Sequence, residues 1–187
     1  MDRVFILDRS GSMETCRDDT IGGFNAFLRE QQAGGGTLTL VLFDHEYQVV
    51  YGNKPITDCP PLTAQTFVPR GSTALLDAIG RAIKAVPAGT QPTVVILTDG
   101  QENASQQYTK AHIKDLIEEK TKAGWTFVYL GANQDAFAEA GTLGIRSECT
   151  VNYDPRRTPE AFRVLSAAMS SQASNNTQPF DFHTEVI

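Results

Sequence analysis

The ten residues VFILDRSGSM, at positions 4–13, hold the most informative stretch of the chain. Four apolar residues in a row are typical of a parallel strand that is buried on both faces. The run ends on Asp8, and hydroxyl side chains follow at every second position, Ser10 and Ser12. Because a carboxylate at the end of a buried strand needs a polar partner, this stretch predicts a strand that leads directly into a polar site.

Similar apolar runs alternate with helix-like segments along the rest of the chain. This alternation predicts an α/β fold, a Rossmann-like open sheet that is mostly parallel and has helices on both faces. A hairpin at residues 44–46 predicts one antiparallel strand at an edge of the sheet. The expected strands are residues 3–7, 37–43, 47–51, 93–97, 125–132 and 148–152, and the expected helices are residues 15–32, 72–86, 109–123, 134–140 and 159–172. Residues 53–69, rich in Pro and Thr, are expected to form an irregular connection.

The length of 187 residues fits a single domain with a sizeable core. We assign residues 1–172 to this domain and residues 173–187 to a polar C-terminal tail. The tail also carries Phe180, Phe182 and Ile187, with Asp181 and Glu185 between them. We expect it to dock either on its own domain, at a sheet edge, or on a partner.

The composition excludes several classes of partner. Sixteen basic and 22 acidic residues give a formal charge of −6, and no cluster of Lys and Arg suggests a nucleic-acid partner. No apolar run approaches the ~18 residues of a membrane span, so no membrane partner is expected. The cysteines, Cys16, Cys59 and Cys149, lie far apart and predict free thiols in a reducing compartment, by default the cytoplasm. The sequence does not indicate an oligomeric state.

A second acid follows another buried strand. Asp99 comes directly after the run at residues 93–98, and ligands of open α/β sheets bind beyond the carboxyl ends of strands, where the strand order reverses. If the strand at residues 3–7 and the strand at residues 93–97 are neighbours, Asp8 and Asp99 face one crevice, and Thr73 closes over it. Carboxylates and hydroxyls suit hard cations, Mg²⁺ or Mn²⁺ before Zn²⁺.

This set of residues resembles the von Willebrand factor type A (vWA) domain and its metal-ion-dependent adhesion site (MIDAS). The family pattern is D-x-S-x-S, a distant Thr and an Asp after a buried strand. DRSGS supplies Asp8, Ser10 and Ser12, GST supplies Thr73, and LTDG supplies Asp99. The resemblance covers roughly residues 1–172.

The resemblance implies a Rossmann-like domain that binds one divalent cation, Mg²⁺ or Mn²⁺, with Ca²⁺ as a further candidate. It implies that the hydroxyls coordinate directly and that one or both acids act through water. It also implies a protein partner that supplies a Glu or Asp carboxylate to the metal. Residues beside the site are then candidate partner contacts: Arg9, Gly71, Ser72, Gln101, Glu102 and Asn103.

Structural roles are the alternative for the same residues. Asp8 and the two serines suit a local turn, Asp99 suits an ordinary turn before Gly100, and Ser72 or Thr73 suits the N-cap of the helix that follows. Asn133 or Asp135 is expected to cap the next short helix. His45, His112 and His183 are expected to be solvated rather than catalytic.

An enzyme is the alternative function. An aspartate that ends a first strand also resembles the nucleophile of Mg²⁺-dependent phosphatases of the haloacid dehalogenase type. Those enzymes need a second acid two residues further on, where this chain has Ser10. We therefore expect a protein-interaction module and not an enzyme.

Overall fold

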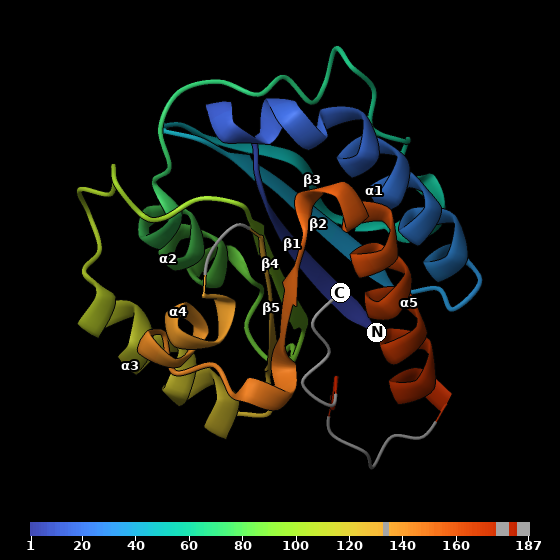
Figure 1. Cartoon of the computed structure of the whole chain (residues 1–187). Helices are drawn as coiled ribbons and strands as arrows, with labels where there is room; N and C mark the ends of the chain where they lie inside the picture. Colours follow the sequence, from blue (N-terminus) through green and yellow to red (C-terminus); the bar gives the residue numbers. More distant parts are fainter. Residues whose placement is uncertain (133–134, 175–179, 183–187) are drawn as a thin grey trace.

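The computed structural model describes residues 1–132, 135–174 and 180–182. The described chain contains a six-stranded sheet in the order β3-β2-β1-β4-β5-β6 (Figure 1). The strands are β1 (Asp2–Asp8), β2 (Thr37–Phe43), β3 (Tyr47–Pro55), β4 (Thr93–Thr98), β5 (Thr126–Ala132) and β6 (Thr150–Tyr153).

The sheet is parallel except at one edge, as predicted. β1 pairs in parallel with β2 on one side and with β4 on the other, whereas β3 pairs antiparallel with β2. The chain order reverses at β1, so the neighbours β1 and β4 form the switch point at which ligands bind in open α/β sheets. This arrangement confirms the prediction that Asp8 and the end of β4 share one edge of the sheet.

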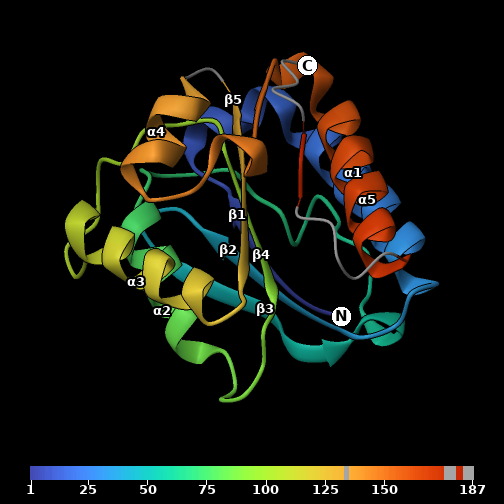
Figure 2. The same cartoon turned by 90° about the horizontal axis from the view of Figure 1, so that it is seen from below.

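Helices cover both faces of the sheet (Figures 1 and 2). The helices α1 (Arg17–Gln32) and α5 (Thr158–Ser174) lie side by side on one face. The opposite face carries α2 (Leu75–Ala85), α3 (Lys110–Lys122) and the short α4 (Ala136–Thr142). None of the helices in the described residues combines the length and the apolar character that crossing a membrane requires.

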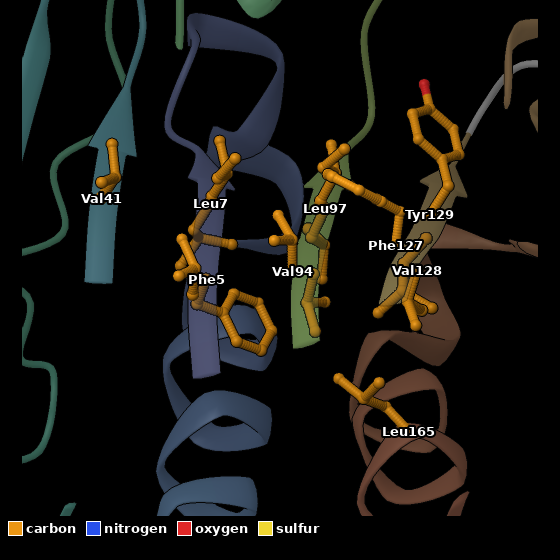
Figure 3. Close-up of a cluster of buried hydrophobic side chains, with 14 of the residues drawn as sticks. Phe5, Leu7, Val41, Val94, Leu97, Phe127, Val128, Tyr129 and Leu165 are labelled. Atoms are coloured by element: carbon orange, nitrogen blue, oxygen red, sulfur yellow. The ribbon is translucent and has the colours of Figure 1, made fainter. Parts of the chain in front are cut away.

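The core lies between the sheet and its two helical layers. Figure 3 shows part of it, with Phe5, Leu7 and Leu97 on the strands and Leu165 on α5. Phe5, Ile6 and Leu7 of β1 are fully buried, which explains why this strand reads as a continuous apolar run. Phe5 meets Phe24 and Phe27 of α1 and Phe162 of α5, with ring centroids 5.4 to 5.9 Å apart. These contacts fix α1 and α5 against the middle of the sheet.

Several element boundaries differ from the prediction by one to four residues. The expected helix at residues 15–32 is divided into the 3₁₀ helix η1 (Gly11–Cys16) and α1, because the chain must first leave the loop that follows Asp8. β3 continues to Pro55 instead of ending at Tyr51. It does so through register shifts and through Asn53, which takes a positive φ of 48° and donates its N–H to Thr39 Oγ1.

The described part of the tail contacts the domain. Phe180 and Phe182 are buried, and the Phe182 N–H donates to the carbonyl of Glu148, just before β6. This favours docking on the domain, although residues 180–182 do not form a strand. The rest of the tail expectation falls on residues 175–179 and 183–187, which lie outside the described residues.

Candidate metal centre

The candidate site lies where three segments meet at the carboxyl ends of β1 and β4. Asp8 is the last residue of β1, and Asp99 directly follows β4. The Gly11 N–H donates to the carbonyl of Gly71 at 3.1 Å, which brings the segment before α2 to the same place. Residues from distant parts of the sequence thus converge at the predicted crevice.

Three hydroxyl groups gather around Gly100. The Ser10 and Ser12 Oγ atoms lie 3.1 Å apart. A Cβ atom placed on Gly100 would lie 3.3 Å from Thr73 Oγ1, 3.6 Å from Ser12 Oγ and 4.0 Å from Ser10 Oγ. The hydroxyls of all three predicted residues therefore face one small region, and Ser12 lies at its exposed side.

Asp8 is buried beneath these hydroxyls. Its Oδ1 accepts the Ser10 N–H and its Oδ2 accepts the Thr98 hydroxyl, each at 2.6 Å. Burial raises the pKa of Asp8 to about 6, and the nearby Asp99 carboxylate adds to this rise, while the two hydrogen bonds oppose it. Because both oxygens are already engaged, the carboxylate suits a role through its charge or through water better than direct coordination.

Asp99 has one engaged and one free oxygen. Its Oδ1 accepts the Ser12 hydroxyl at 2.6 Å, whereas its Oδ2 is buried and has no hydrogen-bond partner. Burial raises the pKa of Asp99, and the Ser12 hydrogen bond opposes the rise. Within the described residues neither Asp8 nor Asp99 forms an ion pair. Burying two carboxylates costs stability, and a cation bound beside them would offset this cost.

These observations fit a hard divalent cation. The donor set contains only oxygen atoms, it includes an unpartnered buried carboxylate oxygen, and it has an uncompensated negative charge. Within residues 1–132, 135–174 and 180–182, no three His, Cys, Asp or Glu side chains cluster as a metal site. A metal would therefore depend on the hydroxyls of Ser10, Ser12 and Thr73 together with the two acids.

Thr73 is held in place by the loop after β4. Its N–H donates to Asn103 Oδ1 at 2.8 Å, and its carbonyl accepts the N–H groups of Asn103 and Ala104. The N-cap of α2 is Ala74, with no side-chain cap. The alternative that Ser72 or Thr73 caps this helix is therefore wrong, and the Thr73 hydroxyl is left for the site.

A buried acid that was not predicted ties the surrounding loops together. Asp44, directly after β2, is fully buried, and its Oδ2 accepts Arg9 Nε at 3.0 Å and Arg70 Nε at 2.9 Å. Its carbonyl accepts the Ala74 N–H. The expectation that Arg9 contacts a partner is wrong, because its side chain is buried against Asp44 and Gln48. The signal that marks Asp44 is the same as for Asp8 and Asp99, an acid at the end of a buried strand.

Glu102 is also engaged internally. Its carboxylate accepts the N–H groups of Ala104, Ser105 and Leu76, the last at the start of α2. Together with Asn103, which remains exposed, it fastens the loop after β4 to α2 and to the segment before it. The expectation that these two residues contact a partner stays a prediction. Gln101 stays exposed beside the site.

The predicted cap of α4 is confirmed for Asp135, whose side chain accepts the Ala138 N–H at 3.0 Å. Asn133 and His183 lie outside the described residues. His45 and His112 are exposed, as expected.

Comparison with known proteins identifies the class. The profile of the von Willebrand factor type A domain matches residues 3–101, which is more than half of the chain and includes all five candidate ligands. The chain belongs to the von Willebrand factor type A domain family. A search of curated proteins finds no match. The family and the Ser at position 10 give no support to the phosphatase alternative.

Solved structures share the fold at low sequence identity. The vWF domain of the type V pilus tip protein Mfa5 from Porphyromonas gingivalis has a TM-score of 0.69 and 12% identity, covering 92% of this chain and 95% of that one. Proximal thread matrix protein 1 from the mussel byssus has a TM-score of 0.65 and 18% identity, over 88% of this chain. The match covers only 44% of that mussel chain. A further structure of the mussel protein, with a zinc-occupied MIDAS motif, has a TM-score of 0.62 and 18% identity, covering 88% and 45% of the two chains.

Proposed function

We propose that this chain is a metal-dependent protein-interaction module. The observation that carries the proposal is the convergence of Ser10, Ser12 and Thr73 around Gly100, above two buried acids that no cation of the described residues neutralises. Ser10, Ser12 and Thr73 would hold the ion through their hydroxyls, and Asp8 and Asp99 would contribute their negative charge. Mg²⁺ is the first candidate, Mn²⁺ the second, and Ca²⁺ a further one.

The bound ion would supply a positively charged position that a carboxylate oxygen of another protein can occupy. Because the groups that would coordinate the ion directly are neutral hydroxyls, the ion would keep an affinity for an anionic partner group on its open side. Asp8, with both oxygens engaged, keeps the loop of the serines in position. Ser12 lies at the exposed side of the site, where a partner can reach it. We propose a Glu or Asp side chain of a protein partner as this group, and no catalytic step.

The state of the three cysteines supports a reducing compartment. Cys16, Cys59 and Cys149 are all free and buried, and burial raises the pKa of each thiol, which keeps them unreactive. We accordingly propose that the protein functions in the cytoplasm.

Water-proton relaxation of the Mn²⁺-loaded protein tests the carboxylate step. Mn²⁺ that keeps bound water enhances relaxation, so a blocked glutamate, N-acetyl-glutamate methylamide, should lower the enhancement when its carboxylate replaces that water. The matched control is the blocked glutamine, which has the same shape without the charge. If both compounds lower the enhancement equally, or if neither lowers it, the proposal that a carboxylate binds the ion is contradicted.

A further inference from the structure

A second hollow adjoins the candidate metal centre. It has a volume of about 360 Å³ and lies between the β2–β3 turn, the segment before α2, the exposed side of α2 and the loop after β4. Ser72 and Ala74 line this hollow, while Thr73 between them faces the hydroxyl cluster. The segment at residues 72–74 therefore forms a wall that the two sites share.

The acids that line the hollow are already satisfied. Asp77 accepts the backbone N–H groups of Gln106, Gln107 and Tyr108 at 2.9 to 3.0 Å. Glu46 is paired with Arg70. The oxygens of both carboxylates are therefore engaged, and within the described residues neither carboxylate forms an ion pair with Arg81.

Arg81 is the cation that remains. Its guanidinium lies 4.1 Å from the centre of the Tyr47 ring, and it forms no ion pair with the described residues. Stacking on the ring face fixes the plane of the guanidinium, while its N–H groups at the edge stay available to an anion. Arg and Tyr are also the residue types most often found at the energetic centres of protein interfaces.

We propose that this hollow is a second anchoring pocket, in which Arg81 binds a carboxylate of the same partner segment whose other acid reaches the metal. This inference rests on the proposed function. The proposal follows from the adjacency of the two sites, because the hollow borders the place where a segment would reach the metal. It also follows from the unpaired guanidinium, because a planar carboxylate matches it in two parallel hydrogen bonds. The partner segment is thus expected to carry two acidic residues close together in sequence.

Blocked peptides test the pocket. One peptide carries a single Glu in a Gly-Ala background, and others carry two Glu residues separated by zero to three residues. Binding to the Mg²⁺-loaded protein is measured by NMR titration. For at least one spacing we expect affinity about three- to tenfold above that of the single-Glu peptide.

Two α2 variants separate the pocket from general charge effects. Arg81→Gln should remove the advantage of the second Glu and leave the Mg²⁺ affinity and the single-Glu peptide unchanged. Lys84→Gln is the matched control, since Lys84 also lies over a tyrosine, Tyr108, at 5.0 Å, but does not line this hollow. It should keep the advantage.

The outcomes distinguish this inference from the proposed function. If no peptide binds in a Mg²⁺-dependent manner, the proposed function fails, and the pocket inference fails with it. If the single-Glu peptide binds but no second Glu helps, or if the advantage persists in Arg81→Gln, the pocket inference alone is wrong.

Discussion

Asp99 is a buried acid that lowers the stability of the fold and that the proposed metal site needs. One of its oxygens holds Ser12, and the other is buried without a partner. The sequence predicted Asp8, Ser10, Ser12, Thr73 and Asp99 because each lies in a motif at the end of a strand or the start of a helix. It did not predict how the oxygens are engaged, since hydrogen-bond directions depend on contacts between segments far apart in the chain.

Replacing Asp99 should separate stability from metal binding. Asp99→Asn keeps an acceptor for Ser12 but removes a buried charge. In EDTA we expect its free energy of unfolding to rise by about 1 kcal/mol, as for other functional residues that are strained in the native state. Its Mg²⁺ affinity should fall at least about tenfold, following the loss of charge. Urea denaturation and calorimetry measure the two quantities, and wild-type metal affinity in this variant would count against a role for Asp99.

Gly100 tests whether the space between the hydroxyls is required. A methyl group there would lie 3.3 Å from Thr73 Oγ1, close enough to crowd the hydroxyl cluster without touching the core. Gly100→Ala should therefore weaken Mg²⁺ binding about tenfold or more, with a change in unfolding free energy below about 1 kcal/mol. Calorimetry and urea denaturation check both. Full metal affinity in Gly100→Ala would show that the ion does not bind between the three hydroxyls.

At the scale of elements, one buried acid joins three loops. Asp44 links the loop after β1 through Arg9, the segment before α2 through Arg70, and the start of α2 through its carbonyl. The strands that carry these loops were predictable from their apolar runs. The Asp44 network was not, because the pairing of two arginines from different loops with one acid needs the folded structure.

Removing the Asp44 charge should loosen these loops. Asp44→Asn leaves the buried Arg9 without its counter-ion, and we expect a loss of about 3–5 kcal/mol in unfolding free energy together with weaker Mg²⁺ binding. Glu46→Gln is the control, since Glu46 pairs with the same Arg70 at the surface and should cost less than about 1 kcal/mol. Equal effects of the two variants on stability and on Mg²⁺ affinity would contradict a special role for Asp44.

The contact between α1 and α5 provides a second test at this scale. A Cβ atom on Gly23 would lie 2.4 Å from the Phe162 ring, whereas one on the adjacent Gly22 would meet nothing within 4 Å. Gly23→Ala should cost about 1–3 kcal/mol through overpacking. Gly22→Ala should instead stabilise the helix by up to about 1 kcal/mol. Urea denaturation of both variants measures the difference, and the same sign for both would contradict the close packing.

For the whole molecule, alternating apolar runs and helix-like segments were sufficient to predict the sheet, its antiparallel edge and the switch point between β1 and β4. The sequence pattern did not predict the features that depend on contacts between distant segments. η1 has no separate apolar stripe, and the last residues of β3 follow a bulge that pattern alone does not show. Phe180 and Phe182 show the same limit, because their docking before β6 depends on a surface formed by distant residues.

The central claim is that the five residues form one divalent-cation site, and calorimetric titration of the metal-stripped protein with Mg²⁺ and Mn²⁺ tests it most directly. We expect saturable binding at a single site in the wild-type protein, and loss of that binding in Asp8→Ala and Thr73→Ala variants that remain folded by circular dichroism. Absence of binding by the folded wild-type protein, or unchanged binding by both variants, would contradict the claim.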